Sequence, residues 1–166
     1  MTIKRWATLL VLSATSAPLF AACERVSQLM GAAYKTDAHL FASTTQLHRY
    51  QALAHVGIWS IYHQQAWSMD VCAPTKREGV TFYPVLRKAN GFAVVNGIWV
   101  IKTFREADIH QVGQRHGLTR VSLLPNRFSA VFQSPDVDSY DRLLERLDRD
   151  KDIERVVPVL VESSVR

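Results

Sequence analysis

The second half of the chain combines short runs of hydrophobic residues with turn residues, a pattern typical of strands. Phe92–Val95 and Ile98–Phe104 are rich in β-branched and aromatic residues, which favour strands. Asn96-Gly97 lies between them and is a strong signal for a two-residue hairpin turn. We therefore expect a hairpin here, whose second strand begins a compact unit.

A short helix is predicted to begin next, at Asp108, a residue that can cap a helix N-terminus. Ile109 and Val112 would share one face of this helix. Gly117 can adopt the left-handed conformation that ends it, with Leu118 in hydrophobic contact beyond the stop.

A second hairpin is predicted after this helix. Val121–Leu124 and Arg127–Phe132 are strand-like segments on either side of Pro125-Asn126. Proline fixes φ and asparagine tolerates the left-handed region, so this dipeptide favours a turn.

A more strongly amphipathic helix is predicted from Asp138. Hydrophobic residues recur there at intervals of three and four, at Tyr140, Leu143, Leu144 and Leu147. The next strand contains Ile153, Val156 and Val157 and then Pro158. Because proline cannot donate to a strand ladder, we expect this to be an edge strand.

The first half has weaker patterns. Glu24–Lys35 and Thr44–Val56 are predicted as helices, Ala73–Glu78 as a loop and Gly79–Leu86 as a strand. The boundary is expected at Ala89-Asn90-Gly91. The class is therefore α+β, with a smaller α/β extension over residues 23–91 and a βαββαβ domain over residues 92–158.

The N-terminus has the pattern of a signal peptide, residues 1–22. Lys4 and Arg5 precede an apolar run that is too short to span a bilayer as a stable anchor. We expect an exported protein, periplasmic or secreted. In that oxidising setting the only two cysteines, Cys23 and Cys72, are expected to form a disulfide. The alternative is a lipoprotein acylated at Cys23, because Leu19–Cys23 also resembles a lipoprotein signal.

The formal charge of the 166-residue chain is +5, and it falls to +3 once Lys4 and Arg5 are removed with the signal peptide. Without a basic stripe this charge gives no reason to expect a nucleic-acid partner. The mature length suffices for one medium domain or two small ones.

Residues that could carry chemistry form no recognisable active site. His48, His55 and His63 lie at intervals of seven and eight, which one long helix could align, but HExxH, CxxC and GxSxG motifs are absent. We therefore expect no enzyme activity, no metal and no cofactor. The aromatic residues Trp59, Tyr62 and Trp67 are expected in the core.

From about Ile98 to Pro158 the chain resembles the prodomain of secreted subtilisin-like proteases. The likeness rests on "VIKTF", "ADIHQVGQRHGL", "TRVSLLPNRFSAVF", "YDRLLERL" and "IERVVPV". It implies a ferredoxin-like domain. No catalytic domain follows in this sequence, so the chain as a whole resembles the separately encoded external chaperones of secreted kexin-like serine proteases.

The resemblance also implies a partner and a binding mode. In such prodomains the exposed face of the sheet packs on two helices of the protease, and the C-terminal strand enters the substrate cleft. Residues 159–166 would be this extended tail. Arg166 would occupy the primary specificity pocket, and Val165, Ser164 and Ser163 the next three subsites, which suits an enzyme that selects basic residues.

Two alternatives remain open on the sequence. The chain could be an exported ferredoxin-like interaction module or lipoprotein without a protease partner, because that fold carries many functions. The second alternative is a small exported enzyme or ligand-binding protein that uses the N-terminal region.

Overall fold

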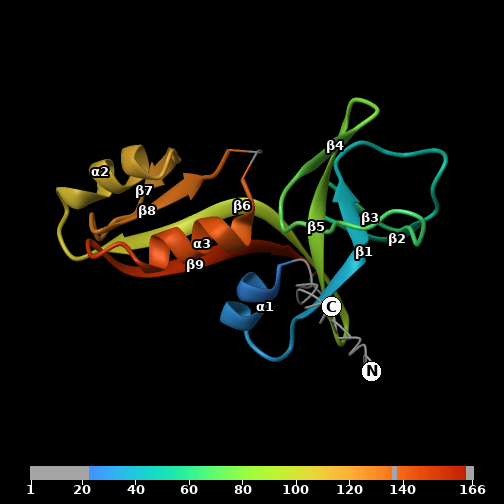
Figure 1. The fold of residues 1–166 in the computed structure, drawn as a ribbon, viewed down its shortest axis with the longest axis horizontal. Coiled ribbons are helices and arrows are strands. Elements are labelled where there is room, and N and C mark those ends of the chain that lie inside the picture. Colours follow the sequence, from blue (N-terminus) through green and yellow to red (C-terminus); the bar gives the residue numbers. More distant parts are fainter. Residues whose placement is uncertain (1–22, 136–137, 164–166) are drawn as a thin grey trace, which may run out of the picture.

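The computed structural model describes residues 23–135 and 138–163, which form an α+β fold of mostly antiparallel sheet with three helices (Figure 1). The expected signal peptide, residues 1–22, lies outside the described residues, as do Ser164, Val165 and Arg166. The elements in chain order are α1 (Glu24–Met30), β1 (Lys35–Ser43), β2 (Ala52–Val56), β3 (Trp59–His63), β4 (Thr75–Arg77), β5 (Val80–Lys88), β6 (Gly91–Thr103), α2 (Asp108–Arg115), β7 (Thr119–Leu123), β8 (Ser129–Gln133), α3 (Tyr140–Asp148) and β9 (Ile153–Glu162).

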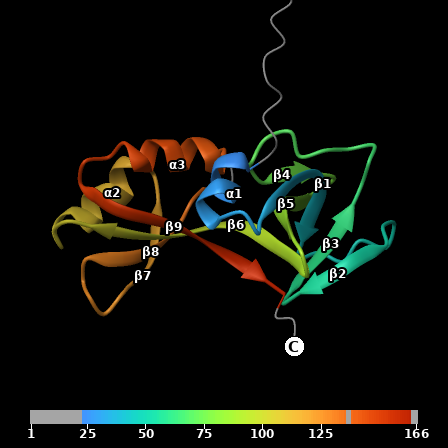
Figure 2. The same ribbon diagram turned by 90° about the horizontal axis from the view of Figure 1, so that it is seen from below.

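One antiparallel sheet runs through these strands in the order β2-β3-β1-β5-β6-β8-β7, with β4 paired to β5 and β9 paired to β6. The 13-residue strand β6 is its centre. On one side β5 pairs with its first part and β8 with its second part. On the other side β9 follows both parts (Figure 2). Strand β6 therefore joins an N-terminal lobe, β1 to β5, to a C-terminal unit of β6, α2, β7, β8, α3 and β9.

The expected hairpin at Asn96-Gly97 is wrong, because both residues lie within β6. Here β6 changes partner from β5 to β8, and its pairing with β9 shifts register between Val95 and Ile98. Gly97 has φ +77°, and a Cβ atom there would lie 2.6 Å from Ser134 Oγ. An Asn-Gly pair serves a bulge as well as a turn, because both conformations need a residue that tolerates positive φ.

Two helices expected in the N-terminal lobe differ from the structure. The helix expected over Thr44–Val56 is wrong, since Ala52–Val56 forms β2 and pairs with β3. The helix expected over Glu24–Lys35 ends at Met30, and Lys35 already begins β1. Gly31, whose φ is +102°, ends the first helix, whereas pairing with β3 overrides the local helix propensity of Ala52–Val56.

The strand predicted over Gly79–Leu86 is confirmed as β5. The expected loop Ala73–Glu78 contains the short strand β4. Ala89-Asn90-Gly91, where a boundary was expected, forms the tight turn between β5 and β6, with Lys88 paired to Gly91. One sheet therefore continues from residues 23–91 into residues 92–158.

The strands and helices predicted after Asn96-Gly97 are confirmed, but Asp108 does not cap α2, because the N-cap is Ala107 and Asp108 is the first residue of the helix. Helix α2 ends at Arg115, Gly117 lies just beyond it with φ +66°, and the Leu118 N–H donates to the Gly113 carbonyl at 2.8 Å. Strands β7 and β8 form the predicted hairpin. Helix α3 begins at Tyr140, two residues after the expected start, and buries the four residues predicted for its core face.

The main core lies between the helices and the C-terminal part of the sheet. Trp99, Ile101 and Phe132 project from the sheet into this core. Helices α2 and α3 cover them with Ile109, Val112, Leu143, Leu144 and Leu147. Two smaller clusters fill the N-terminal lobe: Tyr62 and Trp67 pack in one and Trp59 in the other, as expected for core aromatics.

Helix α1 packs on the same core and is tied to α3. Cys23, at its start, forms a disulfide with Cys72. The Asp141 carboxylate of α3 accepts from the backbone N–H of Val26 at 3.1 Å and of Arg25 at 3.3 Å. Burial raises the pKa of Asp141, while these backbone N–H groups act in the opposite direction. The N-terminal residues are thus held to the helical side of the sheet.

Candidate functional site

The C-terminal sheet has a face with apolar side chains that the three described helices do not cover. Trp99, Ile101 and their partners in register point toward the helices. The alternate residues therefore point the other way, because side chains alternate along a strand. We call this surface the open face, and its apolar members are Ile98, Val100, Val131, Val157 and Val159.

These five side chains form a contiguous patch. Val100 lies opposite Val131 on β8 and opposite Val157 on β9, while Ile98 lies opposite Val159. Four of them are partly exposed, and Val159 is 38% exposed. Helices α1, α2 and α3 all lie on the other side of β6, β8 and β9 (Figure 2). The patch is therefore available to a partner.

More apolar surface lies at the end of the unit far from the N-terminal lobe. Val121 and Leu123 on β7 are exposed, and so are Phe104 and Phe128 in the neighbouring loops. The last two are close in the fold, since Phe128 accepts a backbone hydrogen bond from Thr103 at 2.8 Å. Apolar side chains at this end of the unit are therefore exposed outside the open face as well.

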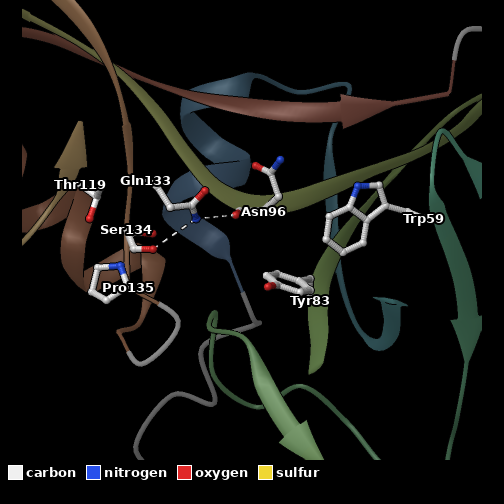
Figure 3. Close-up of a pocket in the computed structure, with 7 residues that line it drawn as sticks. All are labelled: Trp59, Tyr83, Asn96, Thr119, Gln133, Ser134 and Pro135. Atoms are coloured by element: carbon white, nitrogen blue, oxygen red, sulfur yellow. Dashed lines mark hydrogen bonds between the residues drawn. The ribbon is translucent and has the colours of Figure 1, made fainter. Parts of the chain in front are cut away.

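The N-terminal lobe borders the open face and forms a cavity of about 410 Å³ with it (Figure 3). Gln133 lines this cavity and donates to the backbone carbonyls of Asn96 and Ser134, each at 3.2 Å. The rings of Trp59 and Tyr83 pack edge to face, with their centroids 4.8 Å apart, and they form the wall on the side of the N-terminal lobe. The remaining lining residues are Thr119 and Pro135, so no charged side chain lines this cavity.

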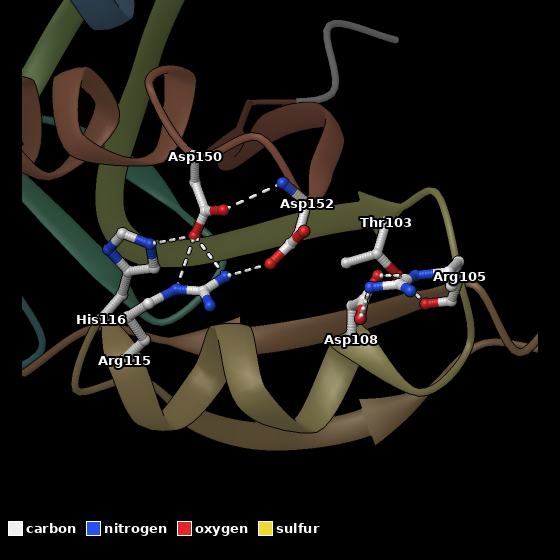
Figure 4. Close-up of polar contacts among 7 residues, drawn as sticks. All are labelled: Thr103, Arg105, Asp108, Arg115, His116, Asp150 and Asp152. Atoms are coloured by element: carbon white, nitrogen blue, oxygen red, sulfur yellow. Dashed lines mark hydrogen bonds and ion pairs between the residues drawn. The ribbon is translucent and has the colours of Figure 1, made fainter.

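A polar network on the helical side joins the end of α2 to the loop between α3 and β9 (Figure 4). Arg115 donates to Asp150 at 2.7 Å and to Asp152 at 3.0 Å, and His116 Nε2 lies 2.7 Å from the Asp150 carboxylate. Burial would raise the pKa of Asp150, but the Asp152 N–H, His116 and Arg115 outweigh it and hold that pKa below its usual range. The ionised carboxylate thus joins the ends of the two helices.

The same view shows a second contact at the start of α2. Arg105 donates to both carboxylate oxygens of Asp108, each at 2.8 Å, and Thr103 Oγ1 donates to the Arg105 carbonyl (Figure 4). These bonds fix the loop that leaves β6. Together with the Asp150 network they hold the helices that support the open face from behind.

The expected tail begins as part of the sheet. Val159 to Glu162 remain paired with β6, and the chain leaves the ladder at Ser163. Pro158 lies on β9, which pairs with β6 and with no other described strand, as expected for an edge strand. Of the four expected cleft residues, Ser163 alone is described, so the placement of the other three stays a prediction.

The three histidines noted in the sequence do not share a helix. His55 and His63 lie on β2 and β3, and His48 lies in the loop before them. Among residues 23–135 and 138–163, no group of three His, Cys, Asp or Glu side chains is placed to hold a metal ion. None of the helices in that range has the length and hydropathy needed to cross a membrane.

The sequence patterns did not single out the open face or the cavity beside it. Alternation in "IWVIK" and "AVFQ" does carry a signal, because Trp99, Ile101 and Phe132 pack inward and their neighbours must point outward. The inward-pointing and the outward-pointing residues are both apolar, however, so the pattern is typical of a strand that is buried on both faces. The cavity is lined by residues that are far apart in the sequence, such as Trp59, Tyr83 and Gln133, and no local pattern links them.

No protein-family model and no curated protein sequence matches the chain. One solved chain, from the crystal structure of Aeromonas sobria serine protease (ASP) and the chaperone (ORF2) complex, overlaps 57% of this chain and 98% of its own length. The sequence identity is 14% and the TM-score is 0.43. A similarity this weak establishes neither a shared family nor a shared function.

Proposed function

We propose that this chain is a dedicated, non-enzymatic chaperone and transient inhibitor of a secreted subtilisin/kexin-like serine protease. The observation that carries the proposal is the open face, a patch of β-branched side chains supported by three helices on its other side. A sheet with one packed face and one apolar, accessible face is suited to bind helices of a partner.

The proposal includes a finer description of the fold. In chain order the C-terminal unit reads β6, α2, β7, β8, α3, β9, and its strands lie side by side in the order β9-β6-β8-β7. This is the element order of a ferredoxin-like βαββαβ domain, in which the first strand lies between the last and the third. The same order is implied by the resemblance to subtilisin prodomains.

The open face would supply most of the binding free energy. Val100, Val131 and Val157 lie side by side across three strands. Covering such half-buried aliphatic side chains contributes roughly 1 kcal/mol each, about half the value for full burial. A rigid, preformed patch also loses little conformational entropy on binding.

The chaperone activity would follow from this docking. Folding of a protease with a large sheet is slow when most of its contacts are non-local. A partner that binds the native arrangement of two protease helices stabilises that arrangement by mass action. The chain would thus act as a template that is needed during folding and not in catalysis.

The inhibitory activity would come from the tail. In the proposal Ser163, Ser164, Val165 and Arg166 enter the substrate cleft as an added strand, so that backbone bonds give affinity and side chains enter the subsites. Arg166 would fill the primary pocket, because a guanidinium group makes bidentate contacts with carboxylates at its base.

The setting would be outside the cytoplasm. Residues 1–22 are proposed as the signal peptide, and the Cys23–Cys72 disulfide suits an oxidising compartment. An exported interaction module without a protease partner is the alternative, and it differs from the proposal in needing neither the tail nor a protease.

Co-expression tests the proposal. A secreted subtilisin/kexin-like protease without its own prodomain would be produced with the wild-type chain, with Val100→Glu or with Leu29→Glu. We expect active protease with the wild type and with Leu29→Glu, which alters an exposed residue of α1 on the helical side. The yield should fall with Val100→Glu, because a charge on the open face is desolvated on docking. Equal yields of active protease with Val100→Glu and with Leu29→Glu would contradict docking through the open face. A protease that matures when it is produced alone would contradict the chaperone function.

A further inference from the structure

The last paired residue of β9 is held by two side chains from outside that strand. Lys88 Nζ, at the end of β5, donates to the Glu162 carboxylate at 2.7 Å, and the Tyr34 hydroxyl donates to the same carboxylate. The Lys88 ammonium also lies 5.2 Å from the centre of the Tyr34 ring. We call this arrangement the Glu162 clamp.

Both residues that bind Glu162 are themselves held in place by the fold. The Tyr34 carbonyl accepts from Ser27 Oγ at 2.8 Å, and the Tyr34 N–H donates to the Gly31 carbonyl at 3.0 Å. The Tyr34 ring also packs against the main core. Lys88 is placed by its pairing with Gly91 in the β5–β6 turn. The point at which the chain leaves the sheet, Glu162, is therefore held in place by Tyr34 and Lys88.

The next residue is confined as well. The Ser163 N–H donates to the Phe92 carbonyl at 3.4 Å, and a Cβ atom on Gly91 would lie 2.3 Å from Ser163 Oγ. Gly91 has φ +147°, which an L-residue rarely adopts. The missing side chain at position 91 therefore leaves room for the Ser163 side chain beside this turn.

The clamp adds little to what holds β9 in place. Nine residues of β9 are already in register with β6, and a partly exposed ion pair contributes little to the free energy of folding. Its main consequence concerns the residues that follow. Three extended residues span at most about 10 Å, so the position of Ser163 decides which sites Arg166 can reach.

We propose that Tyr34 and Lys88 are positioning residues that aim the C-terminal tail at the partner's substrate cleft through Glu162. This inference rests on the proposed function, and it gives the segment before β1 and the end of β5 a role in it. Holding the root of the tail before binding lowers the entropy lost on insertion, which raises the affinity of inhibition without adding a contact to the protease.

Glu162→Gln tests this inference, with Glu145→Gln as the matched control. Glu145 pairs with Arg149 on α3, and its side chain is 36% exposed against 34% for Glu162. Each variant would be titrated against the free protease and against the same protease whose cleft is blocked by an arginyl chloromethyl ketone. We expect Glu162→Gln to weaken inhibition of the free protease about tenfold and to leave binding to the blocked protease unchanged.

Tyr34→Phe should act in the same direction, and Glu145→Gln should change neither measurement. Equal weakening toward the free and blocked protease would assign Glu162 a structural role and overturn the inference. Removal of residues 163–166 separates the remaining cases. If that deletion weakens inhibition and Glu162→Gln does not, the clamp is overturned and the proposed function stands. If the deletion also leaves inhibition unchanged, tail insertion itself fails.

Discussion

The backbone N–H of Tyr140 donates to the carbonyl oxygen of Cys72 at 2.6 Å. The first residue of α3 is thus bonded to the half-cystine that joins α1 to the loop before β4. The disulfide therefore does more than close the N-terminal region on itself. It holds that region against the helix whose other face packs on the sheet.

Replacing both Cys23 and Cys72 with serine should lower the free energy of unfolding by roughly 2–5 kcal/mol, because the bridge closes a long loop in the unfolded chain. The sequence separation is 49 residues. Urea denaturation of the double variant measures the loss. Mass spectrometry of the exported protein supplies the check: the bridge lowers the mass by two hydrogens and acylation at Cys23 adds long chains. Two free thiols in that protein would contradict the pairing.

Leu144→Ala should destabilise the protein by about 2–5 kcal/mol, because it leaves a cavity under α3. Leu144 is 2% exposed in the main core. Leu29→Ala makes the same change on α1 at a side chain that is 48% exposed, and it should cost less than about 0.5 kcal/mol. Chemical denaturation compares the two, and a near-neutral Leu144→Ala would rule out the assigned core.

The stability contributed by Asp150 should depend on pH. Its pKa is lowered in the folded state by the Asp152 N–H, His116 and Arg115, which outweigh the effect of burial. A lowered carboxyl pKa stabilises the fold above the unfolded value, near 4, and this contribution is lost as the pH falls through the folded value.

Asp150→Asn should therefore cost about 1.5–3 kcal/mol at pH 7, the range for hydrogen bonds to a charged group. The difference from the wild type should begin to shrink as the pH falls below about 4, where the unfolded chain takes up the proton, and it should be lost once the pH passes the lower folded value at which the native carboxyl is protonated too. Denaturation curves across this pH range measure the trend. If the difference in unfolding free energy between the wild type and Asp150→Asn stays constant with pH, the charge of Asp150 does not contribute to stability.

The sequence predictions that agree with the structure are mostly those that depend on residues close together in the sequence. Gly117 after α2 and the spacing of Leu143 and Leu147 are local signals, and the structure agrees with both. Asn96-Gly97 is local too, but a bulge and a hairpin turn place the same demand on the backbone. The choice between them depends on β6 having two partners, β5 and β8, along one edge.

The N-terminal lobe was harder to predict because its strands are defined by distant partners. Ala52–Val56 has residues common in helices, and it is a strand because β3 pairs with it. The Glu162 clamp joins positions 34, 88 and 162, which no short pattern links. The open face was predicted only through the resemblance to prodomains, since its residues read as buried strand positions.

Inhibition of a secreted subtilisin/kexin-like protease by the purified chain tests the central claim most directly. The wild type would be compared with a chain that lacks Ser163–Arg166 and with Arg166→Glu, and circular dichroism would confirm that each is folded. We predict inhibition by the wild type, loss of inhibition with retained weaker binding after the deletion, and strong loss with Arg166→Glu, which places like charges together in an acidic pocket. Inhibition of equal affinity by the wild type and the deleted chain would contradict insertion of the tail, and absence of binding by any of the three would contradict the protease partnership.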